Sequence, residues 1–298
     1  MLEHLNPEAV SPERVVVVGA GGFVGGAIMR KLGERGIPAM GLGRADVDLQ
    51  ADGAGAALAA HIEPGDSVVA VSAIAPVKNL DMLRENLAII DTLAKAVQAA
   101  SPAHVLNIGS DAIYADSMNP LSETSCAEPG SLHGIMHLTR ELVLGDAAGD
   151  APFATLRPTL IYGAADPHNG YGPNRFRRLA EAGEDIVLFG EGEERRDHVW
   201  VEDVAELAAR ILMHKSRGAL NAATGTVISF RDAAEEVNGL FEAPVEIKGS
   251  PRSGPMPHNG YRPFDPSATH AAFADFSYTQ PADGFRAVHE QTRDGASG

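Results

Sequence analysis

The chain has 298 residues, of which 44% are hydrophobic and 21% are charged, and its formal net charge is −16. These values are typical of a globular protein with a substantial core, and no apolar run reaches the roughly 18 residues that a membrane helix needs. The negative charge repels nucleic acid and anionic lipid, so we expect neither as a partner and look for local sites that bind anions. The first residues lack the apolar segment of a secretory signal, which favours the cytoplasm, and the lone Cys126 cannot form an internal disulfide.

The first predicted unit is a strand, a glycine turn and a helix, between Arg14 and Arg30. Its valine run is typical of a buried strand, and the apolar spacing after the glycines is that of a helix. Further strands are expected near 37–42, at 67–72 and at 104–108, with helices over 80–100 and from 132. Strands that alternate with helices predict an α/β fold with a doubly wound, Rossmann-like parallel sheet.

The glycines after the first strand are spaced to hold a phosphate group. Gly19, Gly22 and Gly25 form a GxxGxxG pattern, whereas Val24 stands where a GxGxxG pattern needs its last glycine. Small residues permit a tight turn that brings backbone N–H groups and a helix N-terminus to a pyrophosphate. The turn therefore predicts a dinucleotide site, in which we include Phe23 and Val24.

The end of the second strand selects between NAD and NADP as cofactor. An acid there binds the ribose hydroxyls of NAD, whereas a basic residue accommodates the additional phosphate of NADP. This strand is followed by Arg44, which favours NADP over NAD.

After Gly163 the sequence changes to a loop rich in Gly, Pro, Asn and His, followed by short mixed elements and a second loop from Pro251 to Pro263. This change in composition and in the length of the predicted elements indicates a smaller C-terminal lobe that binds a substrate. We expect a dinucleotide-binding domain over 1–163 and a mainly substrate-binding lobe over 164–298, with 198–228 returning to the first domain.

These motifs resemble the extended short-chain dehydrogenase/reductase family, which includes sugar-nucleotide epimerases and dehydratases. The resemblance covers nearly the whole chain and includes an Arg-Pro…Tyr-Gly signature that begins at Arg157. The positions that match the family's cofactor contacts, besides the glycine turn, are Asp48, Leu49, Ser72, Ala73, Ile74, Asn86, Arg157 and Pro158.

The same resemblance implies catalytic and substrate-binding residues. Ser110, four residues before a tyrosine, matches the family's catalytic Ser or Thr, and Asp111 fills a position that dehydratases give to an acid. A second signature, Arg-Asp…Val-x-Asp, implies that Arg196, or else Arg195, binds the substrate diphosphate, for which a guanidinium is well suited. Further candidates for anion binding are Asn174 and Arg175 at a predicted helix start and Arg262 in the late loop.

His133 and His137 occupy the places where the family carries Tyr and, four residues later, Lys. A phenol with a pKa of about 10 needs a lysine to work near neutrality, whereas an imidazole with a pKa of about 6.5 does not. His133 could therefore be the general acid/base of an active enzyme. The pair could instead mark a degenerate relative, bind a metal ion, or be packing residues; because no third ligand stands on the helix, we predict no metal site.

Taken together, the resemblance implies an NAD(P)-dependent epimerase, dehydratase or reductase that acts by hydride transfer on a nucleotide-linked sugar, an anionic small molecule. The alternative is a degenerate family member that binds NAD(P) and a ligand without turnover. Relatives often pair through the helices that include residues 132 onward, so a homodimer is expected.

Overall fold

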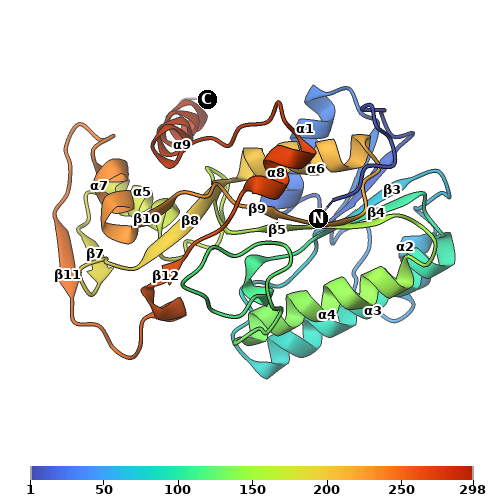
Figure 1. The fold of residues 1–298 in the computed structure, drawn as a ribbon, viewed down its shortest axis with the longest axis horizontal. Coiled ribbons are helices and arrows are strands. Elements are labelled where there is room, and N and C mark those ends of the chain that lie inside the picture. The colour runs from blue at the N-terminus through green and yellow to red at the C-terminus, as the bar shows by residue number, and fades with distance from the viewer. Residues whose placement is uncertain (1, 297–298) are drawn as a thin grey trace.

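The structure is a computed structural model that describes residues 2–296. Its larger part is a sheet of six parallel strands in the order β2-β1-β3-β4-β5-β9 (Figure 1). The strands are β1 (Val15–Val18), β2 (Ala39–Leu42), β3 (Ser67–Ala70), β4 (His104–Ile108), β5 (Phe153–Pro158) and β9 (Gly218–Ala222). This arrangement confirms the predicted doubly wound α/β fold.

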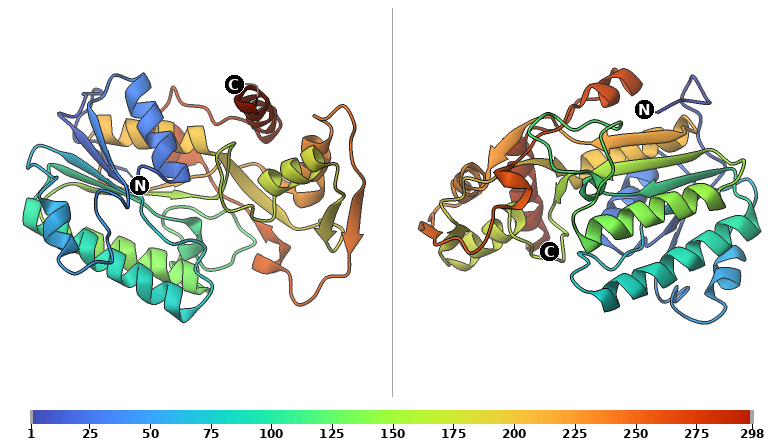
Figure 2. Two further views of the ribbon diagram at one scale, coloured as in Figure 1. Left: turned by 180° about the vertical axis from the view of Figure 1, so that it is seen from behind. Right: turned by 60° about the horizontal axis from the view of Figure 1, so that its bottom comes forward.

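Helices cover both faces of this sheet (Figures 1 and 2). On one face α1 (Phe23–Glu34) packs beside α6 (Val201–Met213), and on the other α3 (Leu80–Ala100) lies between α2 (Ala54–Ala59) and α4 (Leu132–Ala147). The predicted helix over 80–100, the strand at 104–108 and the helix start at 132 are confirmed.

The valine run of β1 shows why this layer forms. Val15 and Val17 contribute to the core beneath α1 and α6, whereas Val16 and Val18 contribute to the core beneath α2 and α3. Successive side chains of a strand point to opposite faces, so a strand covered on both faces buries every residue. Full burial of a valine contributes roughly 1.5–3 kcal/mol, so the four valines of β1 stabilise the cores on both faces of the sheet.

A second, smaller sheet lies beyond the carboxyl ends of these strands (Figure 1). It contains β6 (Leu160–Tyr162), β8 (Arg195–Trp200), β10 (Val227–Ser229) and β12 (Tyr261–Arg262). Beside it β7 (Ile186–Phe189) pairs with β11 (Ile247–Ser250). The remaining elements are α5 (Pro173–Ala182), α7 (Phe230–Asn238), α8 (Ser267–Ala272), α9 (Pro281–Ala296) and the short 3-10 helices η1 (Asp111–Ile113) and η2 (Pro257–Gly260). Within 198–228, α6 and β9 lie in the larger layer, whereas the end of β8 and the start of β10 lie in the smaller sheet.

Two predicted boundaries were wrong. The strand expected at 67–72 ends at Ala70, because the N–H groups of Val71 and Ser72 both donate to the Val18 carbonyl and the chain bends there. The loop expected from Pro251 to Pro263 contains η2 and β12, because Tyr261 and Arg262 pair with β8.

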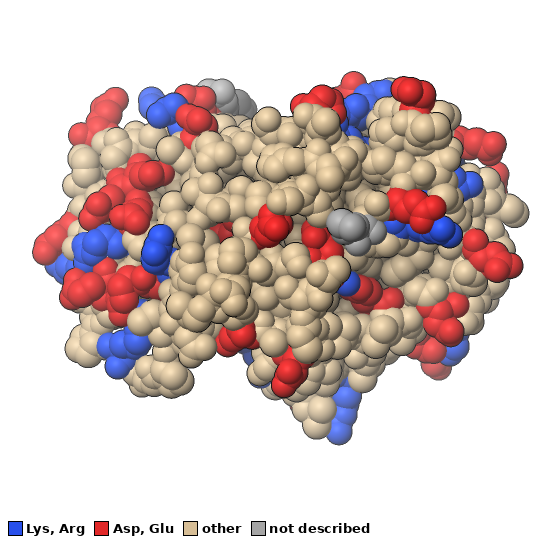
Figure 3. All heavy atoms as spheres, viewed as in Figure 1, with Lys and Arg blue, Asp and Glu red and all other residues tan. Residues whose placement is uncertain are grey.

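Charged side chains gather toward both ends of the molecule in the view of Figure 3, where red acidic and blue basic groups are interspersed. The middle of this face is mainly uncharged, and no broad basic area appears among its coloured residues. No helix within residues 2–296 is both long enough and apolar enough to cross a membrane.

Candidate functional site

A cavity of about 1310 Å³ opens at the carboxyl ends of the parallel strands and extends to the smaller sheet. Its wall includes residues that follow β1, β2, β3 and β4, the loop between β6 and α5, and the start of η2. This edge is where open α/β sheets bind ligands. The cavity exceeds the roughly 300–1,000 Å³ of a pocket for one small ligand.

The glycine turn forms one end of the cavity, where Gly19, Gly22, Phe23 and Val24 line the wall. Gly19 has a φ of +100°, in the region that favours glycine. A Cβ at Gly25 would lie 2.1 Å from the Gly19 carbonyl oxygen, so only glycine lets α1 approach the turn this closely. The first turn of α1 therefore meets the cavity with N–H groups that have no partner inside the helix, an arrangement suited to a phosphate.

The next predicted cofactor positions lie along the same end. Arg44, Asp48 and Leu49 line the wall, as do Ser72, Ala73 and Ile74. The Arg44 side chain is 82% exposed, and its guanidinium lies 3.9 Å from the Asp48 carboxylate. The arginine can therefore turn toward a ligand without breaking a strong ion pair, because exposed pairs are worth at most about 1 kcal/mol.

Three predicted cofactor residues, Gly25, Asn86 and Arg157, do not line the cavity in the described chain. Gly25 is buried in α1, behind the turn. Asn86 is buried, and its amide bonds both the N–H and the carbonyl of Ile74, each at 3.0 Å. It thereby supports the turn beside the cavity. Arg157 turns away, binds Glu141 and donates to the Tyr114 hydroxyl at 2.6 Å, whereas its neighbour Pro158 does line the cavity.

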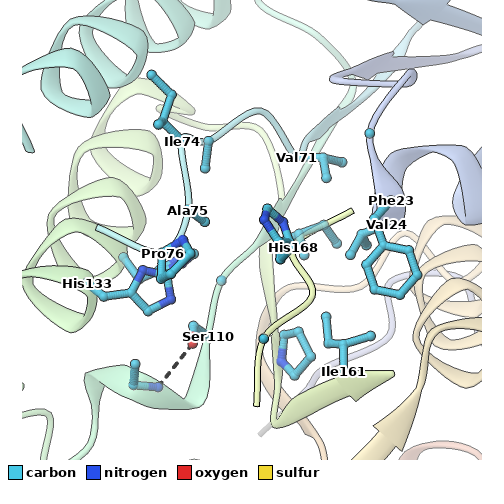
Figure 4. A pocket seen from close by; sticks show the side chains of 18 of the residues that line it. Phe23, Val24, Val71, Ile74, Ala75, Pro76, Ser110, His133, Ile161 and His168 are labelled. Atoms are coloured by element: carbon cyan, nitrogen blue, oxygen red, sulfur yellow. Dashed lines mark hydrogen bonds between the residues drawn. The ribbon is translucent and has the colours of Figure 1, made fainter. Parts of the chain in front are cut away.

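Ser110 stands at the end of β4 and caps η1, where its Oγ accepts from the Ala112 N–H at 3.1 Å. The same hydroxyl lies 3.4 Å from Asp111 Oδ1. Figure 4 shows Ser110 and His133 on the same side of the cavity, with Ile161 and His168 across from them. The structure thus brings together two of the predicted catalytic residues.

The two histidines lie on the first turns of α4, whose N-terminus Ser131 caps by accepting from the Gly134 N–H. The Val77 N–H donates to His133 Nδ1 at 3.5 Å, which leaves Nε2 as the ring nitrogen available to a ligand. Burial lowers the pKa of His133, although the Asp111 carboxylate opposes this shift. Burial, together with His133 and Arg140, lowers the pKa of His137 well below its usual value. Both rings are therefore neutral at pH 7.

His137 lines the cavity edge-on to His133, with ring centroids 4.6 Å apart. Its Nδ1 is buried and has no hydrogen-bond partner among residues 2–296. The same part of the chain contains no group of three His, Cys, Asp or Glu side chains placed to hold a metal ion.

Gly134 sets the distance between α4 and Ser110. A Cβ at Gly134 would lie 2.1 Å from the Ala112 carbonyl oxygen, which belongs to η1.

Gly134→Ala is expected to push α4 outward and to lower the free energy of unfolding by about 1–3 kcal/mol. This loss exceeds the stability gained because alanine favours a helix more than glycine does. In Gly145→Ala, the control on the same helix, the new Cβ would approach Phe153 no closer than 3.4 Å, and the melting temperature should stay near that of the wild type. An unchanged melting temperature in Gly134→Ala would contradict this account.

The predicted substrate residues divide into two groups. Asn174 and Arg196 line the cavity, where Asn174 accepts from the Gly163 N–H and Arg196 is held by Glu194 at 2.7 Å. Arg175 is exposed on α5 and lies outside the described wall.

Arg262 also lies outside the wall, because it is only 1% exposed and its guanidinium is occupied. Its Nε donates to Asp111 Oδ2 at 2.9 Å and its Nη1 to Asp116 Oδ1 at 3.0 Å. A buried guanidinium needs carboxylate partners, so the structure gives Arg262 an internal ion pair in place of the free phosphate clamp expected from sequence. Asp111, predicted as a catalytic acid, lines the cavity as one partner of that pair.

Three further histidines, to which the sequence assigned no role, line the cavity: His168, His198 and His258. His168 and His258 lie in loops rich in Gly, Pro and Asn, whereas His198 lies in β8, directly after the Arg-Asp of the second signature. His198 is fully buried, and burial lowers its pKa to about 4.

The sequence also matches known proteins. The model of a family described as the NAD dependent epimerase/dehydratase family matches residues 15–223. A dTDP-4-dehydro-6-deoxy-D-allose reductase from Streptomyces bikiniensis is 29% identical over 102 residues, which are 32% of this chain and 30% of the relative. A UDP-N-acetyl-alpha-D-glucosaminuronate decarboxylase from Bacillus cytotoxicus is 26% identical over 194 residues, which are 61% of this chain and 59% of the relative. The matches thus span less than two thirds of either relative.

Among solved structures, MoeE5 in complex with UDP-glucose and NAD superposes with a TM-score of 0.81 at 20% identity. The match covers 95% of this chain and 99% of that one. The likeness shows that the two chains share a fold.

Proposed function

The chain belongs to the NAD dependent epimerase/dehydratase family, and on this premise we propose that it binds NADP or NAD beside the glycine turn and transfers hydride to or from a nucleotide-linked sugar. The observation that carries the proposal is the single cavity whose wall contains the glycine turn, Ser110 and His133. The two curated relatives act on nucleotide sugars by name, and the similar solved structure holds UDP-glucose and NAD. The alternative, binding without turnover, finds no support among these relatives, which include two named enzymes.

The residues present fit a nicotinamide dinucleotide. A Cβ at Gly19 would lie 2.8 Å from the Ser72 N atom and one at Gly25 would lie 2.1 Å from the Gly19 carbonyl oxygen, so the turn has room for neither side chain, and α1 begins directly after Gly22. We propose that this turn holds the pyrophosphate, that Asp48 and Leu49 lie at the adenine, and that Pro158 lies under the nicotinamide. When bound, the cofactor supplies or accepts the hydride. The domain division follows: residues 1–163 with the returning 198–228 segment hold the cofactor, and most of 164–298 holds the substrate.

The chain's own residues would handle the substrate oxygen. We assign Ser110 Oγ and His133 Nε2 as its hydrogen-bond partners, with His133 moving the proton. In the resting geometry the neutral ring carries its proton on Nε2, because Nδ1 accepts from Val77, and so it donates to a carbonyl oxygen. Accepting the proton of a substrate hydroxyl requires the proton to lie on Nδ1, which breaks the 3.5 Å contact with Val77. Asn174 and Arg196 are proposed to bind the anionic part of the substrate.

Arg44 is proposed to favour NADP by binding its additional phosphate. Charge-assisted hydrogen bonds of this kind are worth about 1.5–3 kcal/mol, so Arg44→Ala should weaken NADP binding by roughly 10- to 100-fold and leave NAD binding nearly unchanged. Titration calorimetry of both cofactors measures this. Arg30→Ala, on the exposed surface of α1, is the control, because Arg30 pairs with Glu202. Equal losses for NAD and NADP in Arg44→Ala would contradict the assignment.

We also propose a homodimer that forms through α3 and α4. Ile135 and Leu142 lie seven residues apart on α4 and are 41% and 65% exposed, and Leu87 on α3 is 40% exposed. A two-fold interface would bury these side chains. Leu142→Glu is expected to shift the protein to monomers in light scattering at micromolar concentrations, whereas Val10→Glu, at a site 55% exposed, should not. A wild-type monomer under these conditions would contradict the proposal.

A thermal-shift screen with NADP, NAD and a set of UDP-, dTDP- and GDP-sugars tests the proposed function. A ligand that binds only the folded chain raises its stability by an amount that grows with concentration over Kd. We expect stabilisation by one nicotinamide cofactor and by one class of sugar nucleotide. Stabilisation by a nicotinamide cofactor but by none of the sugar nucleotides would contradict the proposal that the substrate is a nucleotide-linked sugar.

A further inference from the structure

A second group of charged and titratable side chains lines the cavity on the side of the smaller sheet. Asp116 follows η1, and His258 lies in η2, 142 residues later in the chain. The His258 Nδ1 forms a short hydrogen bond with Asp116 Oδ1. Arg262 Nη1 donates to the same carboxylate oxygen at 3.0 Å and lies 3.0 Å from the His258 ring nitrogen.

The Asp116 contact assigns the proton of the neutral His258 ring. A carboxylate only accepts, so its hydrogen bond with Nδ1 requires the proton on Nδ1, and the Nη1 hydrogen of Arg262 is directed to Asp116 Oδ1 rather than to the ring. Nε2 is then left with its lone pair. It has no hydrogen-bond partner within residues 2–296 and is not among the buried polar atoms, so it remains accessible. A carboxylate behind an imidazole with a free Nε2 is the arrangement of a general base.

The pair is connected to the proposed reaction centre by a short series of contacts. Arg262 Nε binds Asp111 at 2.9 Å, and Asp111 Oδ1 lies 3.4 Å from the Ser110 hydroxyl. One buried guanidinium therefore separates the His258–Asp116 pair from the residues beside Ser110.

The backbone of η2 is also unusual where it presents the ring. His258 and Asn259 have φ values of +50° and +53°, a conformation that residues other than glycine adopt at an energetic cost. Burial, together with the nearby Arg196 and Arg262, lowers the pKa of His258, against the opposing effect of Asp116. The ring is therefore a neutral base at pH 7.

Hydride transfer at a sugar carbon needs one acid/base, a role already assigned to His133. We propose that His258, oriented by Asp116 and Arg262, is a second acid/base, which removes the proton from the sugar carbon next to the one that is oxidised. This inference rests on the proposed function and narrows it to reactions in which a proton is removed from a sugar carbon. A second base beside the same cavity has no use in a simple ketone reduction.

The step balances as follows. After the hydride passes from a C–OH carbon to the oxidised nicotinamide cofactor and the hydroxyl proton passes to His133, the carbon is a ketone, and the C–H bond beside it becomes acidic. His258 Nε2 takes that proton, the C–H electron pair forms an enolate, and the resulting imidazolium is stabilised by Asp116. The enolate then either regains a proton on carbon, with inversion, or expels a β-hydroxyl that leaves as water with the proton from His258. In both cases the hydride then returns to the sugar, so the sugar and the cofactor undergo no net oxidation or reduction.

Deuterium exchange tests this inference. Purified protein with NAD or NADP is incubated in ²H₂O with UDP-glucose, dTDP-glucose and GDP-mannose in turn, while nicotinamide absorbance is followed and the recovered sugar nucleotide is analysed by mass spectrometry. The wild type is expected to add solvent deuterium to at least one of them, with a transient absorbance change because the hydride returns to the sugar. His258→Gln should keep the absorbance change but exchange at least about 100-fold more slowly. His270→Gln, on exposed α8, is the matched control.

The outcomes separate the two proposals. Exchange by His258→Gln at the wild-type rate, or an absorbance change in the wild type without any exchange, would overturn the role of His258 and leave hydride transfer intact. Neither an absorbance change nor deuterium in any of the three sugars would instead remove the proposed function, and this inference with it. If His258→Gln does not fold, Asp116→Asn removes the orienting carboxylate and should slow exchange at least tenfold with the absorbance change retained.

Discussion

His133→Ala is expected to lower turnover by about 100- to 10,000-fold, the usual contribution of a general acid/base. The affinity for the nicotinamide cofactor should stay nearly the same, because the glycine turn proposed to hold the pyrophosphate leads into Phe23 and Val24, which lie across the pocket from His133 (Figure 4). Ser110→Ala should reduce turnover less, since it removes a hydrogen bond to the substrate oxygen but leaves the group that moves the proton. Steady-state kinetics and calorimetry of the cofactor measure the two effects separately.

The pH dependence of the wild type adds a check on the same residue. Burial lowers the pKa of His133 from its usual value of 6.5, so the neutral ring persists to lower pH than in water. Oxidation of a substrate hydroxyl needs the neutral ring, and the acid limb of kcat/KM should therefore fall below pH 6.5. His61→Ala, at a half-buried position just after α2 and outside the cavity wall, serves as the control. Equal turnover by His133→Ala and the wild type would show that His133 is not the general acid/base.

Gly25→Ala is expected to cause the largest loss of cofactor binding. The added Cβ would lie 2.1 Å from the Gly19 carbonyl oxygen and 2.8 Å from its carbon, and neither backbone atom can move without opening the turn. Overpacking of this kind costs about 1–3 kcal/mol, which corresponds to a loss of roughly 5- to 150-fold in affinity if the strain falls on the bound state. Calorimetry with NADP and NAD, together with the melting temperature, measures both consequences.

The matched control lies on the same helix. A Cβ at Gly33 would meet nothing within 4 Å, and alanine favours a helix over glycine. Gly33→Ala should therefore bind cofactor like the wild type and melt at the same or a slightly higher temperature. Undiminished cofactor affinity in Gly25→Ala would show that the cofactor does not depend on this turn.

The parts of the fold and site that could be predicted from sequence are those encoded by contiguous residues. The helix over 80–100 has its apolar residues at helical spacing and an asparagine cap at its start, and both signals lie within the helix and its flank. The glycine turn is likewise a local pattern, in which the strand, the turn and the helix follow one another. Ser110 and His133 came from a resemblance to family motifs, and the structure places both on one wall.

What could not be predicted depends on contacts between distant segments. Arg262 meets Asp111 across 151 residues, and His258 meets Asp116 across 142, so no spacing in the sequence indicates either contact. The sequence offered Arg262 as a phosphate clamp because arginine in a late loop has that chemistry. In the structure Arg262 is buried and forms internal ion pairs, because a guanidinium removed from water binds the carboxylates nearest to it.

The central claim is that this chain moves hydride between a nicotinamide cofactor and a sugar nucleotide, and single-turnover absorbance tests it most directly. The purified protein, saturated with the cofactor that stabilises it, is mixed with the sugar nucleotide that stabilises it, and the nicotinamide absorbance is followed. We predict a change that His133→Ala slows by at least about 100-fold. Binding of both ligands with no absorbance change and no product by mass spectrometry would contradict the claim and identify a protein that binds nucleotides without turnover.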